Sequence, residues 1–252
     1  MFCNCSSLTN SPDLSAVQNV GSSGMMSMFN GCTALVSAPD LSAIETIGTY
    51  GMYSMFNGCS SLVNGPSLTS LTSVPSYGLY QMFYYCTSLE SVSGLGNVES
   101  VSDYGLQSAF NYCRALVSAP DLSSVKTVGR SGMSSMFQDC VSLVNAPAMN
   151  SIETLSPVAM TYMFNNCQSL VTAPDLVCPT LVSNCYNYIF QNCWSLQNVK
   201  MLATNVTQSN ASSFLYYWMY NTPGGGTMTL ASGVTLPAGN TGVPSTWTVV
   251  YE

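Results

Sequence analysis

One eight-residue phrase recurs along this sequence, and its spacing limits the folds that the chain can adopt. The phrase MFNGCTAL covers residues 28–35 and returns as MFNGCSSL at 55–62, and the chain opens on a version of it, MFCNCSSL. Its phenylalanines are Phe2, Phe29, Phe56, Phe83, Phe110, Phe137, Phe164 and Phe190, spaced by 27 residues six times and by 26 once. A fixed period of about 20–50 residues is typical of solenoids, in which each unit buries its apolar side against the next.

Within one unit, the spacing of the apolar residues changes half-way. Between Leu35 and Ile47 they fall every third position, which predicts short extended segments joined by corners. Between Met52 and Cys59 they fall three and four apart, which predicts one or two helical turns. The expected fold is therefore a leucine-rich-repeat-like solenoid of α/β coils of about 27 residues, hydrogen-bonded at about 4.8 Å per rung.

The pattern stops near residue 197, and the rest of the chain predicts other elements. NASSFLYYWMYN, residues 210–221, predicts a short capped helix, and three short strands are expected at 226–231, 233–237 and 247–252. A solenoid needs its last rung covered, since an open sheet edge recruits another chain. We therefore divide the chain into an eight-repeat solenoid, 1–196, and a small β-containing C-terminal capping module, 197–252.

The composition argues against two classes of partner. Charged residues make up 6% of the chain, with four Lys plus Arg, eleven Asp plus Glu and a net charge of −7. This charge balance argues against nucleic acid as a partner, since phosphate binding needs a basic face. No apolar run reaches about 18 residues, so we expect no membrane insertion. Residue 1 falls on the Met of the repeated phrase, which suggests a piece of a longer chain.

No pattern in the sequence indicates catalysis or a cofactor. The absence of His removes the usual base of a nucleophilic triad. The recurrent aspartates occupy the corner phrase Pro-Asp-Leu, where they are expected to accept backbone hydrogen bonds in Asx turns rather than to gather around calcium. They are Asp13, Asp40, Asp121 and Asp175. A glycosidase would need two carboxylates across a cleft, and nothing points to such a pair.

Most of the cysteines hold one repeat position, which predicts a column of small buried side chains rather than a zinc site. These are Cys5, Cys32, Cys59, Cys86, Cys113, Cys140, Cys167 and Cys193. Cys178 and Cys185 fall outside the column in the irregular seventh unit, and a disulfide between them is an alternative that the sequence leaves open.

The tyrosines are concentrated in units two to four and fall into columns. Tyr50, Tyr77 and Tyr104 share one position, Tyr53 and Tyr80 a second, and Tyr85 and Tyr112 a third, with Tyr84 beside it. The same positions hold other residues in later units while the core stays fixed, so they are expected to face outward. Tyrosine offers a rigid apolar face and a hydroxyl, which suit sugars and protein surfaces. The alternative is that these columns only stiffen the rod.

The phrase Met-Phe-x-x-Cys-x-Ser/Ala-Leu, followed by a short strand and the Pro-Asp-Leu corner, resembles the BspA-like leucine-rich repeats. These occur in surface proteins of bacteria and some protists and in tail-associated proteins of gut phages. The resemblance covers residues 1 to about 202 and implies an extracellular adhesin or recognition role, on a bacterial surface or a virion. It implies no chemistry and carries no single functional residue.

The predicted function is therefore non-enzymatic adhesion: recognition of a host cell-surface glycan or protein through the tyrosine-rich face, as part of a bacterial surface protein or phage tail fibre. Two alternatives remain. One is a structural spacer that holds another domain at a distance. The other is a tailspike-like glycan hydrolase, which the lack of paired acids disfavours.

Overall fold

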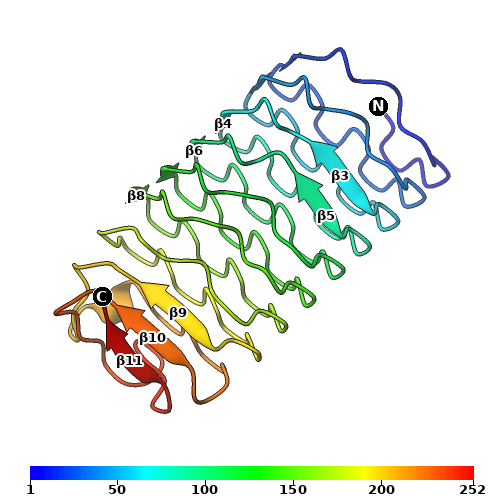
Figure 1. Ribbon diagram of the computed structural model, residues 1–252. Helices are drawn as coiled ribbons and strands as arrows, with labels where there is room; N and C mark the ends of the chain where they lie inside the picture. Colours follow the sequence, from blue (N-terminus) through cyan, green and yellow to red (C-terminus); the bar gives the residue numbers. More distant parts are fainter.

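The computed structural model describes residues 1–252 and shows one elongated stack of coils (Figure 1), with the two termini at opposite ends. The predicted solenoid of leucine-rich-repeat-like coils of about 27 residues is confirmed. Most coils contribute to two parallel strand ladders and to a third side built of tight turns. The structure contains no helix with the length and apolar character that crossing a membrane requires.

The first strand ladder runs along one side of the stack and consists of two-residue strands. Its members are β1 (Asn19–Val20), β2 (Thr46–Ile47), β4 (Ser73–Val74), β6 (Ser100–Val101), β7 (Thr127–Val128) and β8 (Thr154–Leu155). They form a parallel pair, β1-β2, and a parallel four-stranded sheet, β4-β6-β7-β8. In each of these two-residue strands the first residue is polar and the second, such as Val74 or Val101, is buried. This alternation points one apolar side chain per strand into the core.

The second strand ladder reaches the end of the chain. It contains β3 (Asn64–Ser67), β5 (Ser91–Ser93), β9 (Asn198–Met201), β10 (Thr227–Leu230) and β11 (Thr248–Tyr251), which Figure 1 shows as the longest arrows. Between β5 and β9 the ladder continues as single parallel bridges, for example Asn145 with Thr172 and Thr172 with Asn198. Strands β9, β10 and β11 pair in parallel, so the coil geometry extends beyond residue 197.

The third side of each coil is a run of turns that we call the turn ribbon. In the coil of Phe56 it covers residues 50–59. Its backbone N–H groups alternate between two kinds of acceptor: Met55 donates to Met52, three residues back, whereas Phe56 donates to the carbonyl of Met82 in the next coil at 2.9 Å. The predicted helical turns therefore do not form, because an α-helix would bond every N–H to the residue four earlier.

Left-handed backbone recurs at every fourth residue of the turn ribbon. In the same coil, Tyr50, Ser54 and Gly58 have φ values of 58°, 50° and 72°. This region is sterically unfavourable for residues with a Cβ, so it is populated here only because the surrounding bonds require it. The repeated left-handed residues turn alternate peptide groups toward the neighbouring coils. The apolar spacing of three and four is thus produced by successive turns and not by a helix.

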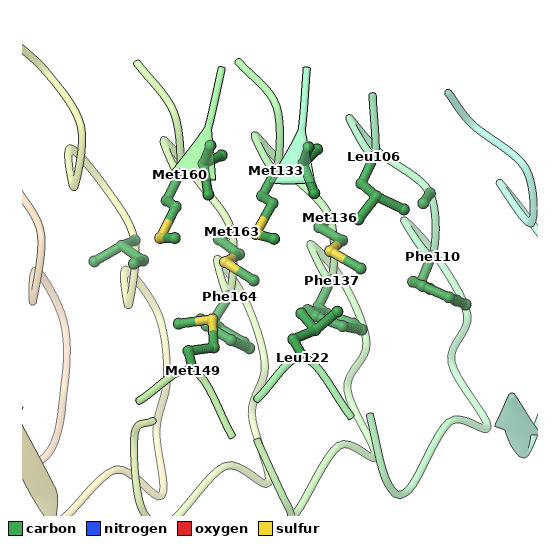
Figure 2. Close-up of a cluster of buried hydrophobic side chains, with 14 of the residues drawn as sticks. Leu106, Phe110, Leu122, Met133, Met136, Phe137, Met149, Met160, Met163 and Phe164 are labelled. Atoms are coloured by element: carbon green, nitrogen blue, oxygen red, sulfur yellow. The ribbon is translucent and has the colours of Figure 1, made fainter. Parts of the chain in front are cut away.

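The core is one continuous cluster between the three sides. Each repeat phenylalanine stacks on the next, with ring centroids 5.3–5.7 Å apart from Phe2 to Phe190. Methionines pack beside this column, and Figure 2 shows Met136 and Met163 next to Phe137 and Phe164. The same positions recur in every coil, so the side chains of one unit close the core of its neighbour.

The predicted column of buried cysteines is confirmed for seven of its eight members, whereas Cys5, in the first coil, is exposed. The column also has a second role. Each thiol donates to the carbonyl of the phenylalanine in the preceding coil, as Cys59 does to Phe29 at 3.1 Å. Seven cysteines make this contact: Cys32, Cys59, Cys86, Cys113, Cys140, Cys167 and Cys193. Cys178 and Cys185 are free and buried, so the disulfide left open by the sequence is not formed.

The cysteine column leads to a prediction about thiol reactivity. Burial raises the pKa of Cys59 to about 12, and only the thiolate reacts readily. We expect an aromatic disulfide reagent at pH 8 to modify only exposed Cys3 and Cys5 in the native protein, and all eleven thiols after denaturation. The double variant Cys3→Ser/Cys5→Ser should show no fast phase. Rapid modification of a third thiol in the native protein would contradict the buried column.

The aspartate corners are confirmed for three of the four recurrent residues. Asp13, Asp40 and Asp121 each accept the backbone N–H of the residue two positions later at 2.9 Å. The backbone and side-chain groups of Ser42 lower the pKa of Asp40. Asp175 differs, because its carboxylate lies 3.7 Å from the ammonium of Lys200.

Residues 197–252 differ from their predicted structure in two places. The helix expected over 210–221 is wrong: only η1 (Ala211–Ser213), a short 3₁₀ helix, forms there. From Phe214 on the chain makes another turn ribbon that accepts bonds from the preceding coil, for instance from Phe190 to the carbonyl of Trp218 at 2.8 Å. The strand expected at 233–237 is also absent, whereas β10 and β11 lie within the other two predicted strands. The division into 1–196 and 197–252 stays a prediction.

The two tryptophans of this segment are buried packing residues. Trp218 is fully buried and its indole N–H donates to the carbonyl of Gly242 at 2.6 Å. Trp247 donates in the same way to Pro223 at 2.7 Å. Both side chains therefore tie the loops of the last coils to the core.

Candidate ligand-binding surface on the turn ribbon

The eight tyrosines singled out by the sequence lie on the turn ribbon, and we call them the first tyrosine cluster. Tyr50, Tyr77 and Tyr104 stack with 4.7 Å between successive ring centroids. Tyr53 and Tyr80 stack beside them at 4.8 Å. The two columns touch through tilted contacts, Tyr50 with Tyr53 at 5.8 Å and Tyr77 with Tyr80 at 5.7 Å. These five rings form one connected surface.

The remaining three members form a smaller group on the same ribbon. Tyr85 stacks on Tyr112 at 4.4 Å. Tyr84 meets both rings edge-on, at 4.6 Å from Tyr85 and 6.1 Å from Tyr112. Arg114 extends over the Tyr112 ring, with its guanidinium 5.7 Å from the centroid. The structure therefore places all eight tyrosines on one side of the molecule, in two groups of stacked rings.

The first tyrosine cluster is reachable from solvent but shallow. Tyr85 is 43% exposed and Tyr50 37%, while the other six rings are half-buried by their stacked neighbours. Burial raises the pKa of Tyr80, and the nearby Tyr53 raises it further. Its hydroxyl therefore stays protonated at neutral pH and can donate a hydrogen bond. The surface offers rigid apolar faces with hydroxyl groups and forms no enclosed pocket.

Two amide side chains in the same columns have buried oxygens without a hydrogen-bond partner. Gln107 follows Tyr53 and Tyr80 in their column, and Asn111 follows Tyr84; the unpaired atoms are Oε1 of Gln107 and Oδ1 of Asn111. An unpaired buried acceptor costs about 1–3 kcal/mol. A ligand hydroxyl that drew either amide outward would satisfy it. These two acceptors are therefore candidate polar contacts beside the aromatic rings.

A second group of tyrosines lies farther along the same ribbon, and the sequence interpretation missed it. We call Tyr162, Tyr188, Tyr216, Tyr217 and Tyr220 the second tyrosine cluster. Tyr162 stacks on Tyr188 at 4.5 Å. The signal was present in the sequence: YYWMYN at 216–221 aligns with TYMFNN at 161–166. Trp218 and Met219 stand where the repeated phrase has Met and Phe. The ninth copy was therefore not recognised, and a helix was predicted in its place.

A shallow surface groove lies away from the tyrosine clusters. Its volume is about 450 Å³, and residues 144–150 and 171–175 line it. Asp175 is its only acidic side chain, so it does not hold the carboxylate pair that glycoside hydrolysis requires. No group of three or more His, Cys, Asp or Glu side chains is arranged to hold a metal ion.

Comparison with known proteins identifies the repeat. A family model for the BspA type leucine rich repeat region matches in six copies, over residues 1–156 and 132–222. No curated protein matches the chain.

Several solved structures are similar to this chain. A leucine-rich repeat protein of T. pallidum has 21% identity and a TM-score of 0.38, with 82% of this chain and 72% of that chain covered. A leucine-rich cell surface protein of Faecalibacterium prausnitzii has 13% identity and a TM-score of 0.43, with 97% of this chain and 85% of that chain covered. A leucine-rich repeat protein of Bacteroides ovatus has 15% identity and a TM-score of 0.27, with 100% of this chain and 79% of that chain covered.

Proposed function

This chain belongs to the BspA-type leucine-rich repeat family, and we propose that it is a non-enzymatic recognition module. It would bind a glycan or protein on a host cell surface through the first tyrosine cluster. The observation that carries the proposal is the stacking of eight tyrosines on one partly exposed side of the rod.

Pre-organisation of the rings supports this function. Tyr77 is held between Tyr50 and Tyr104, each at 4.7 Å, so its ring has little freedom to lose when a partner binds. Immobilising a free side chain on binding costs about 0.5–1.5 kcal/mol, and this surface avoids much of that cost. Tyrosine also supplies a large apolar face together with a hydroxyl, which is why it is enriched in binding surfaces.

The surface chemistry supports an extracellular location, on a bacterial surface or a virion. Charged residues make up only 6% of the chain, so the exterior is built largely from Ser, Thr, Asn and Tyr. Such a surface interacts through hydrogen bonds and stacking rather than through long-range charge. It therefore suits uncharged partners and binding that depends little on salt.

A structural spacer is the second candidate, and the continuity of the second strand ladder favours it. That ladder runs in parallel register from Asn10 to β11 with few interruptions. A rod of this kind would hold neighbouring segments of a longer protein apart. Binding of a cell or glycan by the isolated chain would separate recognition from a spacer role.

The test of the proposed function is the double variant Tyr53→Ser/Tyr80→Ser, because Ser134 occupies the same column naturally. Selective binding by the wild-type chain would first be sought on glycan arrays and on intact gut-type bacterial cells. We expect the variant to bind at least about tenfold more weakly, since each aromatic contact contributes about 0.5–1.5 kcal/mol beyond its buried area. Affinity would be measured by biolayer interferometry, and folding by circular dichroism.

The matched control is Tyr251→Ser, which removes an exposed tyrosine on β11, away from the turn ribbon. It should bind as the wild-type chain does. Unchanged affinity in the Tyr53/Tyr80 variant, or an equal loss in the control, would refute a site at the first tyrosine cluster. Absence of binding by folded wild-type chain on every surface would favour the spacer.

A further inference from the structure

The second tyrosine cluster is built like the first. Tyr162 and Tyr188 stack with their rings nearly parallel, and Tyr188 continues to Tyr217 at 6.0 Å. Tyr216 and Tyr220 meet Tyr217 edge-on, at 4.6 and 5.0 Å. Tyr216 is 41% exposed and Tyr220 is 44% exposed, comparable to the most exposed rings of the first cluster. The sequence interpretation gave these residues no role.

The backbone register places both clusters on the same side of the rod. The N–H of Gln81 donates to the carbonyl of Gln107, which lies in the column of Tyr53 and Tyr80. The equivalent bond near the C-terminus runs from Tyr188 to Tyr216, so Tyr216 occupies that same column. By the same rule Tyr220 occupies the column of Tyr84, since Asn192 donates to Tyr220 as Tyr85 does to Asn111.

Between the two clusters the ribbon is lined by smaller polar residues. In the coil of Phe137 the columns hold Ser131, Ser134 and Ser135, and Asp139 continues the column of Tyr85 and Tyr112 as the one charged member. The centres of the clusters are four coils apart, or roughly 19 Å at the usual strand spacing of about 4.8 Å. One side of the rod therefore carries two aromatic platforms, the first and second tyrosine clusters, separated by an interval of smaller side chains.

The surroundings of the second cluster are uncharged and rich in amides. The ribbon segments 158–166, 182–192 and 213–221 contain no Asp, Glu, Lys or Arg. The amide of Asn165 donates to Gln191 at 2.8 Å, and that of Asn221 donates to Asn192 at 3.0 Å. Such a surface has no charge with which to attract or select a charged partner. Aromatic faces beside amide groups match the apolar faces and hydroxyls of a neutral sugar.

We infer that the second tyrosine cluster is a second binding platform, and that both platforms engage one chain of a neutral polysaccharide at two points. This inference rests on the proposed function of the first cluster. It adds a site and a ligand class: a polymer of uncharged sugars long enough to cross the interval. Two-point attachment turns the second contact into an intramolecular step, so the polymer binds more tightly than either platform alone would allow.

The test separates the two platforms. Native gels containing dissolved mannan, β-glucan or galactan would show which polymer retards the chain. Calorimetry with its trisaccharide, which is too short to reach both platforms, would give the stoichiometry. The second-platform variant is Tyr216→Asn/Tyr220→Gln, because Asn187 and Gln191 occupy those columns in the preceding coil. The first-platform variant is Tyr53→Ser/Tyr80→Ser, and Tyr251→Ser is again the control.

We expect two trisaccharides per wild-type chain, one per chain in either platform variant and none in the combined variant. Polymer affinity should fall about 100-fold in either platform variant, since linked sites gain about 10²–10⁴ from avidity. One trisaccharide per wild-type chain, unaffected by Tyr216→Asn/Tyr220→Gln, would overturn the second platform and leave the first standing. Binding to cells without binding to any of the three polymers would overturn the polysaccharide assignment alone. Unchanged binding of both the trisaccharide and the polymer in both platform variants would overturn both proposals.

Discussion

Replacing Phe110 with alanine is expected to lower the free energy of unfolding by about 3–5 kcal/mol, the usual cost of removing a buried phenyl ring. Phe110 is 1% exposed and lies in the middle of the phenylalanine column. Its ring is stacked on both sides, at 5.3 Å from Phe83 and 5.3 Å from Phe137. Its removal would leave a cavity that neighbouring coils cannot close, because their backbones are held by inter-coil hydrogen bonds.

The measurement is urea denaturation followed by circular dichroism, with Phe2→Ala as the matched control. Phe2 belongs to the same column but stacks on one ring only, Phe29, and is half-buried. We expect its replacement to cost clearly less. Equal losses in the two variants would show that stacking within the column does not determine stability. A loss under about 1 kcal/mol for Phe110→Ala would contradict the cavity argument.

Gly94→Ala is expected to destabilise the protein by about 3–5 kcal/mol, through backbone strain and steric overlap together. Gly94 has φ of 94°, a region that L residues rarely adopt. A Cβ added there would overlap the backbone N of Leu68 and lie 2.8 Å from its carbonyl carbon. Because Leu68 belongs to the preceding coil, the clash would push the two coils apart.

Gly239→Ala is the control, since the two glycines have nearly the same φ but different surroundings. Gly239 has φ of 93°, and a Cβ there would meet no atom within 4 Å. Its replacement should show the strain alone, about 1–2 kcal/mol. The difference in denaturation midpoint between the two variants measures the overlap with Leu68. Equal destabilisation would mean that the coils can shift to admit a methyl group.

Much of the fold could be predicted from the sequence because the repeat carries its own evidence. A strict spacing at Phe56, Phe83 and Phe110 can be satisfied only if successive units place equivalent side chains in columns. The stacking of the phenylalanines and the burial of the cysteines follow from that rule, and the structure confirms both. The aspartate corners followed from local chemistry, because an Asp side chain readily accepts a nearby backbone N–H.

The turn ribbon could not be predicted from spacing alone. Apolar residues three and four apart, such as Met52, Met55 and Phe56, fit a helix as well as they fit successive turns. The choice depends on acceptors in the next coil, such as the carbonyl of Met82, which a local pattern does not contain. The same ambiguity hid the ninth coil, where Trp218 and Met219 resemble the apolar side of a helix.

The candidate site was predicted in part. Columns of tyrosines followed from their spacing, but the contacts between columns did not. Tyr50 meets Tyr53 because Tyr50 is in the left-handed region, at φ of 58°. That conformation is imposed by hydrogen bonds with the neighbouring coils and is uncommon for an aromatic residue. The second tyrosine cluster depends on the ninth coil and was missed with it.

The direction of the hydrogen bonds between coils has a mechanical consequence. In both strand ladders and in the turn ribbon, these bonds join neighbouring coils and so lie along the length of the rod. Tension applied between the two ends loads the bonds of one coil at a time, so the rod peels instead of shearing. Each coil set free lengthens the tether by roughly 90 Å, taking 27 residues at about 3.4 Å each. A chain built this way yields in equal steps and can dissipate a pull while its remaining coils stay folded.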